Sequence, residues 1–199
     1  MIVPYNGTTN FSRNGDYVAE YPDPDMQYRE IRRHSLRDAD AVHRYEADLM
    51  RYAKLIRHFL LRTPADPTSF KPRDLMEMLH MGKTLLKMGE DAIYDMMRLY
   101  TMSISEYLDE YFEHPLIKAA KAGSGNIGSA MGVMSPGTGY VPLHHAMGDV
   151  DGNMGAWGFA RGGMGAIARA MGDCLEDHGG EILTGSGVDQ ILVSNGKVT

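Results

Sequence analysis

The sequence predicts an α+β fold in which a helix-rich first part, residues 1–122, precedes a glycine-rich second part, residues 123–199. Three observations predict it. Apolar residues recur every three or four positions through most of the first part, as on one face of a helix. Of the 23 glycines, 19 follow Lys121, which favours tight turns there. A strand–helix–strand pattern then occupies the end of the chain.

The first part is expected to begin with a hairpin over residues 8–21, because Asn14-Gly15 is the preferred pair of a type I′ turn. A capping-box-like sequence from Ser35 to Asp38 then starts an amphipathic helix of about seven turns, which prolines at 64–72 end. Further helices are expected over 75–89, 93–100, 104–112 and from Pro115 onward, where proline suits the first turn.

The second part is expected to start a helix near residues 135–140 and to form a short strand at 157–160. An amphipathic helix over 163–178 ends at Gly179-Gly180, as glycine commonly ends helices. Strands are predicted at 181–184 and 188–194, with Asn195-Gly196 turning a last hairpin. Since the chain stops within a strand signal, we expect it to be a piece of something longer.

Composition excludes several classes. The net charge of −6 argues against a nucleic-acid partner, which needs a basic surface. The basic stretch 29–37 is interleaved with acidic residues and is interpreted as a solvated helix face. No apolar run is long enough for a membrane span, and no signal peptide is visible, so a cytoplasmic protein is expected. The single cysteine, Cys174, excludes an internal disulfide and is interpreted as a packed thiol.

The chain contains 16 methionines, most of them at helical spacing. Methionine is an adaptable core residue, and it also lines surfaces that accommodate large apolar ligands. The core interpretation is favoured, and the second is kept open.

Residues 123–128, Gly-Ser-Gly-Asn-Ile-Gly, match the G-x-G-x-x-G dinucleotide fingerprint, and Asp149 lies 21 positions further on. The fingerprint requires a strand before its first glycine and a helix after its third. Here the preceding residues are alanine- and lysine-rich and helical. We therefore interpret the match as chance.

A second glycine site has better context, because Gly162-Gly163 lies between the predicted strand at 157–160 and the predicted helix. A helix N-terminus approached in this way can present free N–H groups to an anion. The glycines could equally serve close helix–strand packing. Neither alternative is favoured by spacing alone.

Two adjacent histidines, His144 and His145, point to different sides of a helix and cannot share a metal ion as an i, i+4 pair can. We expect no metal site. One of the two is expected to be a polar core or interface residue.

Three stretches, residues 115–120, 134–145 and 155–165, resemble the phytoene-desaturase-like FAD-dependent oxidoreductases. The chain is most similar to the branch of pyridine nucleotide-disulphide oxidoreductase domain-containing proteins, which is related to phytoene dehydrogenase. The resemblance runs from about Asp23 onward. It implies a helical substrate-side region at 1–122 and a return into a partial FAD-binding domain at 123–199, with the true fingerprint expected before Met1.

The resemblance also implies site residues. Gly162, Gly163 and Val188 would lie at the cofactor, with Val188 binding the FAD adenine through its backbone. Tyr140, His144 and Trp157 would lie beside a cavity for an apolar small-molecule substrate. The resemblance assigns no catalytic acid or base, and the substrate and electron acceptor stay unknown.

Two hypotheses follow. In the first, the parent protein transfers a hydride between a large apolar substrate and FAD, and this chain alone neither retains FAD nor turns over substrate. In the alternative, the chain is a non-catalytic helical binding or self-assembly module. In both, exposed apolar surface favours a homodimer.

Overall fold

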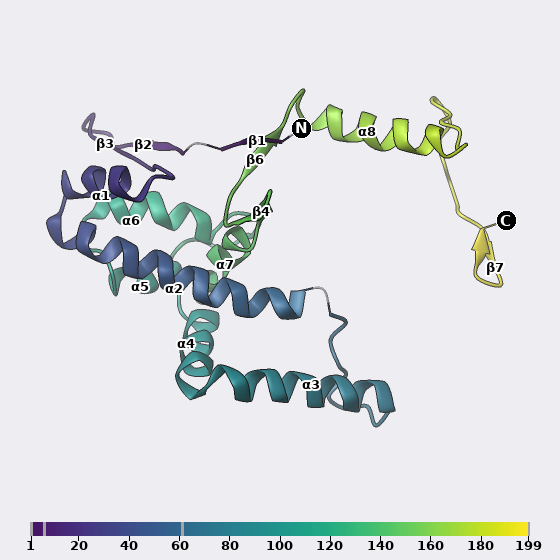
Figure 1. Cartoon of the computed structure of the whole chain (residues 1–199), viewed down its shortest axis with the longest axis horizontal. Coiled ribbons are helices and arrows are strands. Elements are labelled where there is room, and N and C mark those ends of the chain that lie inside the picture. The colour runs from purple at the N-terminus through teal and green to yellow at the C-terminus, as the bar shows by residue number, and fades with distance from the viewer. Residues whose placement is uncertain (1, 6, 61, 199) are drawn as a thin grey trace. The chain divides into compact units, whose positions relative to one another are not determined.

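The computed structural model describes residues 2–5, 7–60 and 62–198 and confirms the α+β class (Figure 1). The chain divides into two compact units. The larger is Pro4–Trp157, and the smaller combines Met1–Val3 with Gly158–Thr199. The predicted division into substrate-side and cofactor-side parts after residue 122 stays a prediction.

The larger unit opens with the predicted hairpin, in which β2 (Thr9–Phe11) pairs antiparallel with β3 (Tyr17–Ala19). The predicted type I′ turn is wrong. That turn needs a positive φ at both central residues, and here only Gly15 has one (φ 87°). Ser12 and Asp16 close a three-residue loop through the bond from Ser12 N to Asp16 O at 2.7 Å. A glycine ending a three-residue loop is the next most common hairpin geometry.

Helix α1 (Pro24–Arg32) follows the hairpin, and its bounds are not among the predicted ones. Its start is nevertheless encoded locally. Asp23 is the N-cap residue, and its Oδ1 accepts a hydrogen bond from Met26 N at 2.8 Å. Pro24 occupies the first helical position, where its missing N–H costs nothing. The Asp23-Pro24 pair is therefore a sequence signal for the start of this helix.

The long helix α2 (Leu36–Leu60) confirms the predicted amphipathic helix. Ser35 Oγ accepts from Asp38 N at 3.1 Å, which is half of the expected capping box. The other half differs, because the buried Asp38 carboxylate accepts from Glu113 N and His114 N, both at 2.9 Å. Asp38 thus joins the start of α2 to the start of α6 (Pro115–Ala122).

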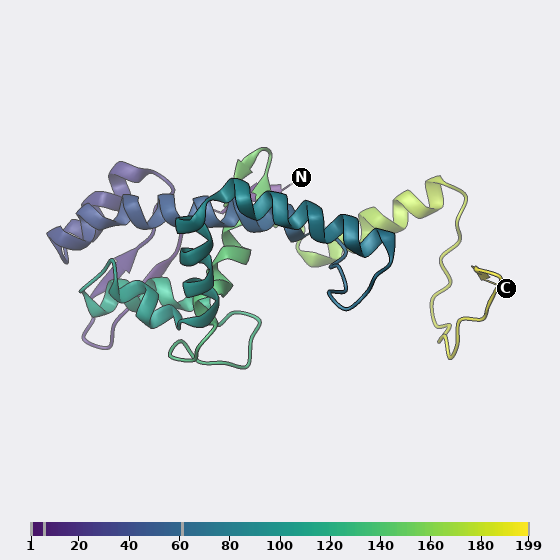
Figure 2. The same ribbon diagram turned by 90° about the horizontal axis from the view of Figure 1, so that it is seen from below.

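The remaining predicted helices are also present. They are α3 (Pro72–Met88), α4 (Glu90–Thr101) and α5 (Ile104–Asp109), with α6 beginning at Pro115. The 3₁₀ turn η1 (Gly123–Gly125) follows α6, and a second, η2 (Thr138–Tyr140), leads into α7 (Val141–Ala146). Figure 2 shows α3 and α4 from below, joined end to end.

Strands β4 (Asp149–Val150) and β5 (Asn153–Met154) form a small hairpin that the sequence analysis missed. Asp151 (φ 52°) and Gly152 (φ 84°) turn it, and Asp-Gly is a strong signal for such a turn.

The core of the larger unit lies where α1, α2, α5, α6 and α7 meet (Figure 1). Tyr45 of α2 packs edge-on against Tyr111 and Phe112, with ring centroids 5.4 and 5.2 Å away. Aromatic pairs prefer such offset and edge-on arrangements. Aliphatic residues fill the space around them: Ile31, Val42, Leu99, Ile104, Leu108, Ile117 and Leu143.

The core interpretation of the methionines is wrong for α3. This helix has no buried residue, and Met76 and Met81 are exposed, as is Met97 of α4. Helical spacing shows which residues share a face, but whether anything covers that face depends on the rest of the structure. The alternative, an apolar ligand or partner surface, therefore stays open for these residues.

The smaller unit contains the first two residues of β1 (Ile2–Pro4), which pairs with β6 (Gly158–Ala160), and then α8 (Met164–Asp177). The last hairpin is confirmed, with β7 (Val193–Ser194) and β8 (Lys197–Val198) joined by Asn195-Gly196. The strand predicted at 181–184 is absent, and only the last two residues of the strand predicted at 188–194 form one, as β7; the other described residues there have no regular structure. A strand needs a hydrogen-bonded neighbour, and none lies beside these residues.

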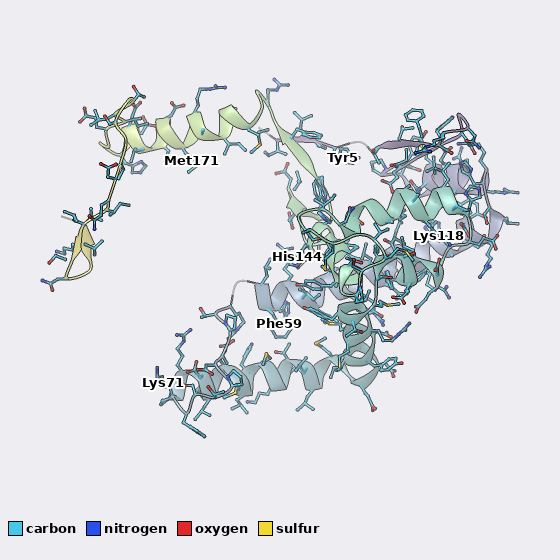
Figure 3. All side chains as sticks on the ribbon, turned by 180° about the vertical axis from the view of Figure 1, so that it is seen from behind. Tyr5, Phe59, Lys71, Lys118, His144 and Met171 are labelled. Carbon is cyan, nitrogen blue, oxygen red and sulfur yellow. The ribbon has the colours of Figure 1, made fainter. Side chains whose placement is uncertain are left out.

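No residue from Gly158 to Val198 is buried. Cys174 is accordingly exposed, so its interpretation as a packed thiol is wrong. Its Sγ lies 3.9 Å from Nδ1 of His178, one turn further along α8. Figure 3 labels Met171 on the same helix.

The arginines of the basic stretch are exposed, as predicted, but they lie on two helices, the end of α1 and the start of α2, and acidic residues pair with them. Arg33 lies 2.9 Å from Glu30 and 3.3 Å from Asp16, and Arg37 lies 2.8 Å from Glu113. Among the described residues, no helix combines the length and apolar character needed to cross a bilayer.

Candidate functional site

The substrate-side candidate Tyr140 is held by a tight corner between α4 and η2. Gly137 N and Gly139 N both donate to the carbonyl oxygen of Met102, at 3.0 and 3.1 Å. Thr138 is buried, and its Oγ1 accepts from Ile104 N at 2.9 Å. These bonds fix the turn against the start of α5 and leave Tyr140 little freedom.

Gly139 is required at this corner for steric reasons. A Cβ atom there would lie 3.0 Å from Leu99 O and 3.1 Å from Met102 O. Contacts that short are tighter than ordinary packing allows, so a larger residue would push η2 away from α4. The glycine therefore determines how closely Tyr140 approaches α4.

Tyr140 contacts two other aromatic side chains. Its ring stacks on Tyr100 of α4, with centroids 4.2 Å apart and planes 20° apart. His144 of α7 meets it edge-on at 4.7 Å. His144 is exposed and is labelled in Figure 3. We name Tyr100, Tyr140 and His144 the aromatic cluster.

Tyr100 is a member of this cluster that the sequence analysis did not select. Its spacing within α4 resembles that of a core residue, yet it is 47% exposed. Burial of its hydroxyl, and then the hydrogen bond with Tyr140, raise the pKa of Tyr100 above its ordinary value. The phenol therefore stays protonated and neutral near pH 7.

Trp157 does not join the aromatic cluster through any contact found here. Its ring lies 5.1 Å from that of His145, and its Nε1 donates to His145 O at 3.1 Å. Burial lowers the pKa of His145 below its ordinary value, and His144 acts in the same direction. Nε2 of His145 is buried without a hydrogen-bond partner. The expectation that one of the two histidines is a polar core or interface residue stays a prediction, and the half-buried His145 is its candidate.

The candidate cofactor glycines lie at the start of α8. Gly162 (φ 87°) and Gly163 (φ 75°) both have left-handed backbone conformations, which require glycine. A Cβ atom on Gly163 would meet nothing within 4 Å, so close packing does not explain that glycine here. A Cβ on Gly162 would lie 3.3 Å from the Cβ of Ala166, which is a tight contact, and 3.7 Å from the guanidinium of Arg169, so packing remains an explanation for Gly162. Ala166 N donates to Gly163 O at 3.1 Å, which leaves the amides of Met164 and Gly165 without a backbone partner among the described residues; these two amides and the Arg169 cation suit an anionic group.

Val188, the third cofactor candidate, is 76% exposed and lies outside any strand. Its backbone groups are consequently free of sheet pairing in this structure. The structure does not bring Val188 together with the glycine pair through any contact found among the described residues.

The fingerprint match at residues 123–128 lacks the strand before its first glycine, as expected for a chance match. Gly123–Gly125 continues helix α6 as a 3₁₀ turn, and no strand precedes it. Gly125 is buried, and a Cβ atom there would lie 2.5 Å from Ile104 Cγ2, so this glycine serves packing. The carboxylate of Asp149 accepts a hydrogen bond from Gly152 N at 2.8 Å and pairs with Arg57 at 3.5 Å.

Across the described residues, His, Cys, Asp and Glu side chains nowhere gather in a group of three that could hold a metal ion. The chemical character of the substrate-side candidates is aromatic and imidazole. Such groups bind apolar and flat ligands by contact and stacking.

Comparison with known proteins identifies similar sequences. Residues 15–199 match the family described as flavin containing amine oxidoreductase. The chain is 35% identical over 173 residues to pyridine nucleotide-disulfide oxidoreductase domain-containing protein 2 of Mus musculus, an alignment covering 84% of the chain and 30% of that protein. The Rattus norvegicus protein of the same name is 35% identical over 177 residues, covering 85% and 30%.

The chain therefore spans about 30% of the length of these curated relatives. No solved structure was found that matches it.

Proposed function

Because the chain belongs to the family of flavin-containing amine oxidoreductases, we propose that it forms the substrate-side part of an FAD-dependent oxidoreductase. The reaction we propose is hydride transfer between a large apolar substrate and the flavin, as the likeness to phytoene-dehydrogenase-related proteins implies. FAD supplies the redox chemistry when bound, and the protein supplies binding, orientation and exclusion of water.

The observation that best supports this function is the aromatic cluster. Tyr100, Tyr140 and His144 come from three elements, and the corner at Met102 holds them together although Tyr100 and His144 are exposed. Aromatic side chains commonly line the binding sites of apolar ligands. We propose that Trp157, next to His145, extends the same substrate-side surface.

The start of α8 is the proposed cofactor-side element. At the start of α8 the amides of Met164 and Gly165 make no backbone hydrogen bond to a described residue, and the Arg169 guanidinium lies beside Gly162, so these donors fit a phosphate-bearing cofactor. We propose that the unpaired backbone of Val188 contacts the adenine of FAD.

A segment exchange tests this function. The matched segment of the rat relative is replaced by the part of this chain that aligns with it, and retained flavin is measured by absorbance after gel filtration. We expect the hybrid to retain flavin, and Tyr140→Leu in the hybrid to lower substrate turnover while flavin retention stays unchanged. A hybrid with normal helical circular dichroism but no flavin would contradict the proposal.

We propose in addition that the 199-residue chain alone retains no FAD and has no turnover. The chain spans about 30% of its relatives, and the described residues of its smaller unit include none that is buried. Dialysis of the chain with excess FAD measures this directly. Flavin absorbance that survives dialysis in a one-to-one ratio would refute it.

Self-association is a second candidate function, and the exposed face of α8 favours it. An open apolar groove with a volume of about 760 Å³ lies along this helix, lined by Ile167, Met171 and Leu175 among others. We propose that two copies cover these faces in a homodimer. Light scattering over a range of concentrations is expected to show a dimer that Met171→Lys weakens and Asp173→Lys does not. A monomer at every concentration would exclude it.

A further inference from the structure

We infer that Tyr100 and Tyr140 together bind a flat, π-bonded segment of the substrate, so that Tyr100 determines substrate specificity. This inference rests on the substrate-side role proposed above and adds to it a ligand class and a residue. The ligand class is an uncharged group with a planar aromatic or conjugated system.

The arrangement of the two rings is the first argument. They are nearly parallel, 4.2 Å between centroids and 20° between planes, so each ring covers one face of the other. Nearly half of Tyr100 nevertheless remains exposed. A flat group that stacks on this pair gains the same kind of contact that the rings make with each other.

The second argument is that the pair is already fixed. Met102 O accepts two hydrogen bonds from the η2 corner, which positions Tyr140. On the other side, Asp95 holds α4 against α2 by accepting from Tyr52 Oη at 2.5 Å and from Arg51 at 3.3 Å. A ligand that stacks on rings held in this way loses little binding energy to ordering them.

The third argument concerns the neighbours of Tyr100 on α4. Residues three, four and seven positions earlier lie on the same side of a helix, and here they are Met97, Met96 and Ile93. All three are uncharged, and Met97 is 65% exposed. The charged neighbour Arg98 is paired with Glu110. The surroundings therefore favour an apolar ligand over an ionic one.

The competing explanation is that the stack only stabilises the corner between α4 and η2. The two explanations differ in what a shape-matched ligand does. A purely structural stack would not distinguish a flat ligand from a saturated ligand with the same carbon skeleton. A binding pair distinguishes them, because only the flat ligand can stack.

The experiment uses the purified 199-residue chain with ¹³C-labelled tyrosine rings, titrated with 2-naphthol or with its saturated analogue decahydro-2-naphthol. Ring signals are assigned from the Tyr100→Phe and Tyr140→Phe variants. We expect 2-naphthol to shift the Tyr100 and Tyr140 signals and to bind at least roughly threefold more tightly than the saturated analogue.

Variants then separate binding from structure. Tyr100→Leu is expected to weaken 2-naphthol binding roughly threefold to tenfold, whereas Tyr100→Phe keeps the ring and stays within about twofold. Tyr94→Leu is the matched control, since Tyr94 is an exposed tyrosine of the same helix and should leave the affinity unchanged.

Three results would overturn the inference: equal affinity for the two ligands, Tyr100 and Tyr140 signals that do not move, or a Tyr100→Leu chain with lowered thermal stability but unchanged affinity. None of these measurements involves flavin. If 2-naphthol binding fails these tests but the hybrid retains flavin, the ligand class is rejected and the oxidoreductase function stands. If 2-naphthol binds as expected but the hybrid retains no flavin, the oxidoreductase function is rejected and the ligand class stands.

Discussion

Replacing Asp38 with alanine is expected to destabilise the larger unit by about 3–5 kcal/mol. The Asp38 carboxylate is fully buried and accepts hydrogen bonds from Glu113 N and His114 N, both at 2.9 Å. A hydrogen bond to a charged group contributes about 1.5–3 kcal/mol, and loss of the acceptor leaves two amides without a partner. Asp38→Asn keeps one acceptor oxygen and should lose about half as much.

Urea unfolding followed by the fluorescence of Trp157 measures this change. Trp157 is the only tryptophan of the chain and belongs to the larger unit, so its signal reports that unit. Asp40→Ala is the matched control on the same helix, because the exposed Asp40 carboxylate accepts a hydrogen bond from Tyr28 Oη at the surface. Its expected cost is below about 1 kcal/mol.

The reasoning would be refuted if Asp38→Ala and Asp40→Ala cost the same, or if Asp38→Ala cost less than about 1 kcal/mol. Either result would mean that the amides at the start of α6 find other acceptors, so that Asp38 does not join α2 to α6.

The other predictions concern packing, capping and pH. Gly125→Ala should lower the free energy of unfolding by about 1–3 kcal/mol, measured by thermal unfolding, because the added Cβ would overlap Ile104. Gly123→Ala is the control and should cost nothing, because open space surrounds Gly123. Equal effects of the two substitutions would point to a different role for the glycines. Ser103→Ala removes a complete capping box and should cost about 0.5–2 kcal/mol in urea, and no change would show that the box is dispensable. Because the folded chain lowers the pKa of His145, neutral His145 contributes to the free energy of unfolding above the ordinary pKa of 6.5. This contribution is lost as the pH falls through the lower pKa of the folded chain. An NMR titration of His145 with a midpoint at or above 6.5 would contradict this.

Elements whose signals are local could be predicted from the sequence. The hairpin at Asn195-Gly196 forms although its surroundings are open, because both residues have the positive φ that a type I′ turn requires (50° and 75°). The segment predicted as a strand at 181–184, and most of the one predicted at 188–194, have strand-forming residues but no neighbouring strand among the described residues, and a propensity alone cannot supply hydrogen-bond partners.

The substrate-side cluster could be predicted only in part. Tyr140 and His144 are neighbours in sequence and in space, so a resemblance over a short stretch placed them together. Tyr100 lies 40 positions earlier, and it meets Tyr140 because the hydrogen bonds at Met102 hold η2 against α4. Its helical spacing resembles that of core residues, since periodicity identifies a face of the helix but not what covers it.

The two hydrogen bonds on Met102 O also separate Tyr140 from the exposed stretch just before it, residues 126–132. Because the corner is closed by its own backbone, the length of that stretch can change without moving the tyrosine pair, and longer loops cost little entropy. Insertions or deletions between η1 and the corner would therefore be tolerated, and this stretch is where related chains could diversify around a constant aromatic pair.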